Sequence, residues 1–313
     1  MTRRPRPLGL LMRIAAAVAT SVLAPASISA AADDDGVWQL NRPKVAGTLR
    51  LNLRERKAEP GGKGEAAKVV ERQADWAASE TAIVVCDMWD DIYCQSSKQR
   101  IGVLVPKMNA VLNEARGLGV MIIHAPSETM TMYADTSYRL RMQRAEPVEP
   151  PVPIQRNCVL DTAKEPPLPI DTSVSPCDDP VTGAVVRRFS REHPGLDITG
   201  FDGISDDGRE IFNYCRRQGI KNIVIMGVHT NMCILGRSFG IRQLTRLGFN
   251  VALARDLTDA MYDPRQPPYV SHARGTELVV EHIETYWCPS IDSQDLTRTL
   301  PGTSGPAPSE SGH

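Results

Sequence analysis

Aromatic side chains are scarce in this sequence, since tryptophan, tyrosine and phenylalanine together make up 5% of its 313 residues. So low a share disfavours an all-β binding module that relies on aromatic contacts. The formal net charge is only −1, whereas a surface for nucleic acid would show as an excess of basic residues. Apolar residues make up 42% and charged residues 23%, which is ordinary for a globular protein. The composition favours an α/β enzyme or binding protein and argues against nucleic acid as a partner.

The N-terminus has the three parts of a secretory signal peptide. A basic stretch up to Arg13 is followed by an apolar run, residues 14–23, and then by small residues up to Ala32. We expect cleavage after Ala31 or Ala32 and export to the periplasm or the extracellular space. The apolar run is too short for a stable membrane anchor. Removing residues 1–32 takes four positive charges from a net charge of −1 and leaves −5.

Residues 33–80 are predicted to form a β extension before the main domain. Residues 47–54 alternate between apolar and polar side chains, as a half-buried strand does. Pro60-Gly61-Gly62 predicts a turn, and residues 68–73 follow as the returning strand. We expect a β-hairpin laid on the main domain.

Short apolar runs separated by helix-length segments organise the main domain, residues 81–298. Apolar runs without alternation indicate strands that are buried on both faces, and hence a parallel sheet covered by helices. The runs occupy residues 82–86, 120–123, 223–226 and 251–254. Amphipathic stretches such as 98–118 and 206–218 lie between them, and Ser205 is the expected N-cap of the second.

Two segments depart from this rhythm. Residues 134–200 contain two proline-rich stretches, and we expect them to form a long ordered insertion near the mouth of the site rather than a second domain. Residues 299–313 lack residues that form a core, so they are predicted to be a disordered tail.

Two reactive side chains follow two of the apolar runs. Asp87 comes directly after the first run, and Cys233 follows the third run after a short turn. In open parallel sheets, ligands bind outside the carboxyl ends of the strands. Apolar residues recur at helical spacing from Ile234 to Leu247, so we expect the thiol at a helix N-terminus, with a depressed pKa. An acid and a thiol at neighbouring strand ends can act as base and nucleophile.

Several motifs resemble those of the isochorismatase-like cysteine hydrolases, the family that contains nicotinamidases and related amidases. Cys86 to Asp91 is similar to the family's opening motif D-M-Q-N-D-F, and Gly227 to Cys233 to its nucleophile loop G-V-x-T-D-x-C-V. Residues 255–260 resemble a later strand end, and residues 272–283 the last helix. The chain looks closest to a secreted branch of the family. The resemblance implies a three-layer α/β/α fold, a mainly parallel six-stranded sheet, and a Cys–Asp–Lys catalytic set without a cofactor.

Carried over to this chain, the resemblance makes Cys233 the nucleophile and Asp87 the group that takes its proton. The family's cis peptide would fall between Val228 and His229, and it would turn the N–H of His229 toward the same point as the N–H of Cys233. Two such donors form an oxyanion hole. The expected reaction is attack of the thiolate on a small-molecule amide or related C–N compound, loss of the amine, and hydrolysis of the thioester.

The family's catalytic lysine has no counterpart in this sequence. The corresponding region, residues 196–202, contains no lysine, and the nearest basic residues are Arg187, Arg188 and Arg191. Arginine can hold a charge, but it cannot shuttle a proton at neutral pH. Two other classes of protein therefore stay open. One is a catalytically silent member of the fold that binds a small molecule. The other is a thiol redox protein, although the sequence contains no C-x-x-C motif.

Pocket residues can be proposed from their positions alone. His124 and Glu128 follow the second apolar run, but they do not supply the three or four closely spaced ligands of a structural zinc site, so we expect no metal. The pocket candidates are Trp89, Tyr93, His124, Glu128 and Tyr133. The resemblance leaves a homo-oligomer open, because family members often associate.

The remaining cysteines divide into buried thiols and disulfide candidates. Cys86 and Cys215 lie within a predicted strand and a predicted helix, where buried thiols are common. Cys158 and Cys177 lie in the insertion and are the expected disulfide pair. Cys94 and Cys288 are further candidates, and the sequence alone does not fix the connectivity.

Overall fold

The computed structural model describes residues 42, 44–57, 67–180 and 183–303. The predicted signal peptide and the predicted turn at Pro60-Gly61-Gly62 lie outside the described residues. In the described part, no helix is long and apolar enough to cross a membrane.

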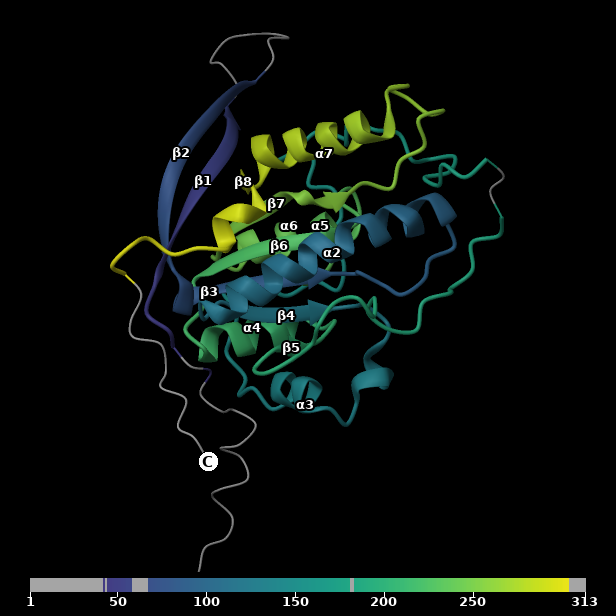
Figure 1. Ribbon diagram of the computed structural model, residues 1–313. Helices are drawn as coiled ribbons and strands as arrows, with labels where there is room; N and C mark the ends of the chain where they lie inside the picture. The colour runs from purple at the N-terminus through teal and green to yellow at the C-terminus, as the bar shows by residue number, and fades with distance from the viewer. Residues whose placement is uncertain (1–41, 43, 58–66, 181–182, 304–313) are drawn as a thin grey trace, which may run out of the picture.

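One eight-stranded sheet forms the centre of the molecule (Figure 1), in the order β2-β1-β8-β7-β6-β3-β4-β5. The strands are β1 Thr48–Lys57, β2 Lys68–Ala77, β3 Thr81–Cys86, β4 Met121–Ala125, β5 Gly203–Ile204, β6 Asn222–Val228, β7 Asn250–Asp259 and β8 Ser290–Ile291. Strands β3 to β8 pair in parallel, and β1 pairs antiparallel with both β2 and β8. The predicted six parallel strands with an N-terminal hairpin are confirmed. The hairpin continues the sheet through β8 instead of lying on top of the domain.

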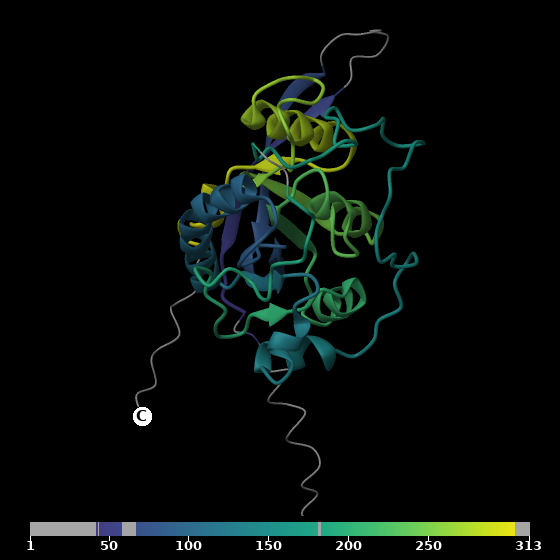
Figure 2. The same ribbon diagram turned by 90° about the vertical axis from the view of Figure 1, so that its right-hand side faces the viewer.

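Helices cover both faces of this sheet, and each face has its own apolar core (Figure 2). The helices are α2 Gln95–Gly117, α3 Ser137–Gln143, α4 Gly208–Arg217, α5 Cys233–Gly236, α6 Ile241–Arg246 and α7 His272–Tyr286; the 3-10 turns are Ala78–Glu80, Met130–Tyr133 and Ser293–Leu296. Along β3, Val84 packs into the core beneath α4, α6 and α7, whereas Ile83 and Val85 pack into the core beneath α2. Burial on both sides explains why the strands are continuously apolar.

Helix α4 has a different N-cap residue from the predicted one. Asp207 is the N-cap, because its carboxylate accepts the backbone N–H groups of Arg209 and Glu210. The prediction of Ser205 as N-cap was wrong. The Ser205 hydroxyl instead accepts the N–H of Asp207, so it supports the turn that leads into the helix.

Cys233 begins a helix, as predicted, but the chain after it forms two short helices, α5 and α6. Arg237 leaves α5 in an extended conformation, with φ −65° and ψ 161°. Gly240 then brings the backbone close to α5, and a Cβ there would lie 2.8 Å from the carbonyl oxygen of Ile234. The spacing of apolar residues cannot reveal such a break, because both short helices contribute to the same core.

In its described residues, the insertion (134–200) contains α3 and otherwise irregular backbone that runs around the molecule (Figure 2). Its middle is held by Glu165, a buried carboxylate that accepts hydrogen bonds from Arg242, His282 and Trp287. Buried charges need partners of this kind to offset lost hydration. The insertion is therefore fixed to the helices α6 and α7 that cover the sheet.

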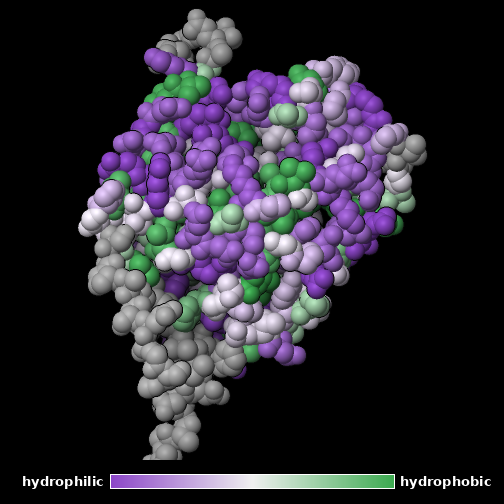
Figure 3. All heavy atoms as spheres, viewed as in Figure 1, coloured by the Kyte–Doolittle hydropathy of each residue, from purple (hydrophilic) through white to green (hydrophobic). Residues whose placement is uncertain are grey.

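The outer surface over α2 is largely hydrophilic (Figure 3), as expected of an amphipathic helix that packs on a sheet. The C-terminal segment passes near the hairpin. The backbone N–H of Leu300 donates to the carbonyl of Thr48 at 2.7 Å. Part of the segment predicted to be a disordered tail thus contacts β1, and residues 304–313 lie outside the described residues.

Candidate active site

The sheet brings Asp87 and Cys233 together. Asp87 directly follows β3, and Cys233 begins α5 after β6. The two strands are parallel neighbours, with Cys86 opposite Gly227. The Cys233 thiol donates a hydrogen bond to the Asp87 carboxylate, which is fully buried.

Both oxygens of Asp87 have a further donor. The backbone N–H of Ser127 donates to Oδ1 at 2.8 Å, and Nε–H of Arg237 donates to Oδ2 at 3.0 Å. Burial raises the pKa of Asp87, while Arg237, Cys233 and Ser127 act in the opposite direction. The carboxylate is thus held in a fixed orientation but remains basic enough to take a proton.

Arg237 is the cation that the sequence analysis missed. The three arginines named there do not contact Asp87: Arg187 donates to the carbonyl of Glu128, Arg188 pairs with Asp91, and the backbone of Arg191 contacts Asp90. Arg237 lies one helical turn after Cys233, and that spacing was the available signal. Its guanidinium lies beside Asp87 and Cys233, where the resemblance implied a cation.

The environment raises the pKa of the Cys233 thiol, so the predicted depression of its pKa was wrong. Burial is the main cause, and the neighbouring Asp87 carboxylate adds to it, while Arg237 and the backbone N–H of His229 oppose. Helix α5 has only four residues. In the resting site the sulfur therefore carries its proton and shares it with Asp87.

The loop before Cys233 contains the cis peptide between Val228 and His229 that the resemblance implied. Gly227, with φ +111°, permits this loop, because a Cβ there would overlap the carbonyl oxygen of Cys86. The N–H of His229 is directed at the sulfur of Cys233. The backbone of the loop thus faces the sulfur of Cys233.

The imidazole of His229 points away from the sulfur, into the protein. It is 2% exposed, and its Nε2 lies 2.6 Å from the hydroxyl of Ser97 on α2. Burial lowers the pKa of His229 to about 4, so the ring is neutral. This side chain therefore anchors the loop on α2, and only its backbone N–H is available to the site.

Strand β7 holds the same loop from the other side. The backbone N–H of Thr230 donates to the carbonyl of Asp259 at 2.9 Å, and its hydroxyl lies 2.7 Å from that of Thr258. The Asp259 carboxylate in turn binds Arg100 and His272. The motif at residues 255–260 therefore positions the loop that precedes Cys233.

Of the predicted pocket residues, Trp89 contacts the backbone around Asp87, and its own backbone N–H donates to the carbonyl of Asp87 at 3.0 Å. Its indole N–H donates to the carbonyl of Ser127 at 3.1 Å, and its ring stacks on Phe189 with the centroids 4.4 Å apart. Tyr93 is half-buried and close to Asp179. The structure groups Trp89 with the backbone that holds Asp87, and places Tyr93 near the start of α2.

The other three pocket candidates lie around the insertion. His124 is fully buried, with Nδ1 2.7 Å from Glu192 and Nε2 3.3 Å from Asp202. The Tyr133 hydroxyl accepts the backbone N–H of Glu192, while the Glu128 side chain is about half exposed. His124 and Tyr133 therefore hold Glu192, and with it the insertion, in place.

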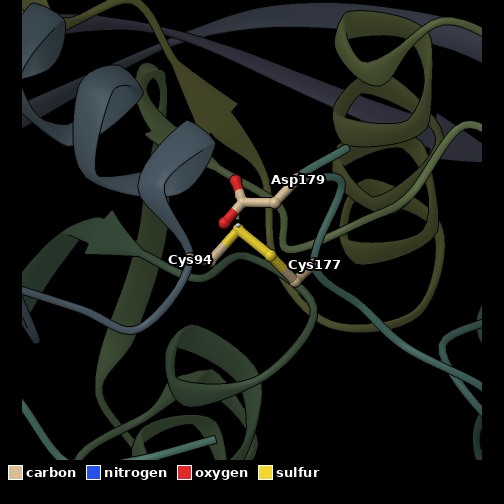
Figure 4. A group of neighbouring side chains, drawn as sticks. All are labelled: Cys94, Cys177 and Asp179. Atoms are coloured by element: carbon tan, nitrogen blue, oxygen red, sulfur yellow. Dashed lines mark hydrogen bonds between the residues drawn. A yellow bond between two sulfur atoms is a disulfide. The ribbon is translucent and has the colours of Figure 1, made fainter. Parts of the chain in front are cut away.

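The disulfide joins Cys94 to Cys177 (Figure 4), so the expected pair of Cys158 and Cys177 was wrong. Cys158 is a buried free thiol that donates to Gln243. Its segment runs beside α5 and α6, whereas Cys177 lies at the start of α2, so the two cysteines do not meet. Cys86, Cys215 and Cys288 are also buried and free. Cys94, Cys177 and Asp179 are close enough to suggest metal ligands, but the two sulfurs are bonded to each other.

The family model of the isochorismatase domain matches residues 184–276, which is less than a third of the chain. This segment includes β6, the loop with Cys233, Arg237 and β7. The resemblance stated from the motifs is confirmed over this segment. No curated protein matches the chain.

Solved structures with a similar arrangement include hydrolases of low sequence identity. A cysteine hydrolase from Pseudomonas syringae pv. phaseolicola is 16% identical, with a TM-score of 0.44 over 71% of this chain and 92% of its own. An isochorismatase-like hydrolase from Alkaliphilus metalliredigens is 12% identical, with a TM-score of 0.40 over 71% and 98%. N-carbamoylsarcosine amidase from Thermoplasma acidophilum is 10% identical, with a TM-score of 0.37 over 68% and 96%.

Proposed function

We propose that this protein is an exported cysteine hydrolase of the isochorismatase-like type, which cleaves a small amide or a related C–N bond through a thioester. The observation that supports it is the contiguous set of Cys233 thiol, Asp87 carboxylate and Arg237 guanidinium at the ends of two neighbouring strands. A nucleophile, a base and a fixed cation in hydrogen-bond contact are the parts that nucleophilic catalysis needs.

In the first half of the reaction, Asp87 takes the proton of Cys233 as the sulfur attacks the substrate carbonyl carbon. The carbonyl π electrons move to oxygen, where the backbone N–H groups of His229 and Cys233 stabilise the negative charge. The intermediate then collapses, the C–N bond breaks, and Asp87 returns its proton to the departing nitrogen. The products are an amine and a thioester on Cys233.

In the second half, water attacks the thioester carbonyl while Asp87 takes one of its protons. The second tetrahedral intermediate expels the sulfur, which regains the proton from Asp87, and a carboxylic acid leaves. Arg237 stays charged throughout, because guanidinium does not give up a proton at neutral pH. Asp87 is therefore the proton carrier in both halves, and Arg237 keeps the Asp87 carboxylate in position between them.

The test is turnover of a panel of small amides by the wild-type protein, followed as release of ammonia or amine. We expect Cys233→Ala to abolish turnover, and Asp87→Asn to reduce it by about 10²–10⁴-fold, the usual contribution of a general acid–base. Mass spectrometry of the Cys233 peptide after rapid quenching should show the acyl group. Cys158→Ser is the matched control, because this other free thiol does not contact Asp87.

A catalytically silent protein that binds a small molecule is the alternative outcome. It predicts saturable binding of an amide without turnover and without an adduct on Cys233. Such a result in the wild-type protein would contradict the hydrolase.

A further inference from the structure

Within the described residues, the guanidinium of Arg237 donates only one of its five N–H groups to another protein group. Its Nε–H donates to Asp87, whereas Nη1 and Nη2 have no protein acceptor within the described residues. The side chain is 23% exposed, and neither Nη atom is among the buried nitrogens that lack a partner, so both can be reached from solvent. An oxygen atom of a ligand could therefore accept from them.

These unused donors are fixed beside the nucleophile. The backbone N–H of Arg237 donates to the carbonyl of Cys233 at 3.0 Å, and its backbone pairs with Asn157 from the insertion. The guanidinium also interacts electrostatically with the sulfur of Cys233. With the backbone held on both sides and Nε held by Asp87, the Nη1–Nη2 edge has a set direction in the site.

When Asp87 takes the thiol proton, the negative charge passes from its carboxylate to the Cys233 sulfur and then to the substrate oxygen, so Arg237 keeps an anion beside it. The Nη1–Nη2 edge stays without a partner in the described residues throughout. A carboxylate on the substrate would give this edge a partner. The planar Nη1–Nη2 edge matches the two oxygens of a carboxylate, which arginine binds through two parallel hydrogen bonds.

We propose that the Nη1–Nη2 edge of Arg237 is a recognition site for a substrate carboxylate, so that the preferred substrates are small amides or ureido compounds that carry a carboxylate near the scissile bond. The inference rests on the proposed hydrolase function, since it places this group beside Cys233 as the nucleophile. Arg237 would then have two roles: its Nε orients the base, and its terminal nitrogens select the substrate.

The test compares alkylation of Cys233 by iodoacetate and by iodoacetamide, which share a leaving group and differ in a carboxylate against an amide. In both reactions the thiolate sulfur displaces iodide, so the ratio of the two rates does not depend on how much thiolate is present. We expect the wild-type protein to favour iodoacetate. In Arg237→Gln the ratio should fall by about tenfold or more, the effect of losing a hydrogen-bonded charge.

Matched variants separate recognition from general charge. Arg187→Gln removes an exposed arginine of the insertion that does not contact Asp87, and it should leave the ratio unchanged. Arg237→Lys keeps a charge but lacks the planar edge, so its ratio should lie between those of wild type and Arg237→Gln. A measurement that needs no variant is protection: acetate, but not acetamide, should slow labelling of wild-type Cys233 by iodoacetamide in a saturable way.

The outcomes distinguish the two proposals. Equal ratios in wild type and Arg237→Gln, or no protection by acetate, would overturn carboxylate recognition. A Cys233 that still reacts in an Asp87-dependent way would then leave the hydrolase standing. If neither reagent labels Cys233 in the folded protein, but both label it after unfolding, the hydrolase and the carboxylate site fail together.

Discussion

At the scale of single residues, burial and neighbouring charges act in opposite directions on the pKa of His124. Burial by itself would lower its pKa, but Glu192 and Asp202 raise the pKa of His124 to about 9. The Asp202 carboxylate also pairs with Arg116, whose Nη2 lies 2.9 Å from Oδ2 of Asp202. The imidazolium thus joins β4 to the insertion through Glu192 and to the start of β5 through Asp202.

This raised pKa predicts a pH-dependent stability with a definite sign. The folded protein holds a proton on His124 up to about pH 9, whereas the unfolded chain releases it near 6.5. The stabilisation is therefore complete below pH 6.5 and disappears as the pH rises to 9. Urea unfolding between these values should show a free energy that falls with pH more steeply in wild type than in His124→Gln, by at most about 1.4 kcal/mol per pH unit.

The control for this experiment is His193→Gln. The pKa of His193 is lowered, so its titration falls below this window and its removal should not change the slope. Parallel slopes for wild type and His124→Gln would mean that His124 is neutral in the folded protein.

Sequence reasoning identified Cys233 and Asp87 correctly as neighbours, because the ends of parallel strands in one sheet lie at the same edge. Arg237 could not be found in the same way. The position of Arg237 depends on where α5 ends and on its own extended backbone conformation. Both follow from the close packing of the backbone around Gly240. His124 was assigned to a pocket because its partner Glu192 comes from an insertion whose path the sequence does not reveal.

At the scale of elements, the start of α2 joins the insertion to the site. Asp179 accepts the backbone N–H groups of Gln95 and Ser96, so the insertion supplies the cap for the helix. The disulfide between Cys94 and Cys177 makes the same connection covalent. Because α2 also holds His229 through Ser97, this attachment lies directly behind the nucleophile loop.

Removing the disulfide should therefore destabilise the protein and loosen the insertion. Cys177→Ser should lower the free energy of unfolding by about 2–4 kcal/mol, because the bond closes a long loop with a sequence separation of 83. Limited proteolysis should cleave the insertion faster in this variant. Cys158→Ser, which removes a free thiol of the same insertion, should change both measurements much less. Equal effects of the two substitutions would contradict the role given to the bond.

The regular elements could be predicted well because their signals are local. Each of the four apolar runs became a strand of the parallel sheet, since burial on both faces demands continuous apolar residues. The disulfide pairing and the break between α5 and α6 depend on contacts between segments far apart in the sequence. Such contacts leave no periodic pattern in either segment.

At the scale of the whole molecule, the N-terminal sequence and the disulfide support the same compartment. Residues 1–32 have the pattern of a cleaved signal peptide, although they lie outside the described residues. A structural disulfide such as Cys94–Cys177 forms and persists in oxidising compartments and is rare in the cytosol. The proposed export would account for both features, and it predicts that maturation and disulfide formation occur together.

The full chain, expressed in a host with a secretory pathway, should be recovered outside the cytoplasm with Ala32 or Asp33 as its first residue. Mass spectrometry without reduction should show the Cys94 and Cys177 peptides linked. A chain that lacks residues 1–32 should stay in the cytoplasm with both thiols reduced, because nothing directs it to the oxidising compartment. A cytoplasmic product that begins at Met1 would contradict export. A secreted product in which Cys94 and Cys177 are both free thiols would show that export does not lead to the disulfide.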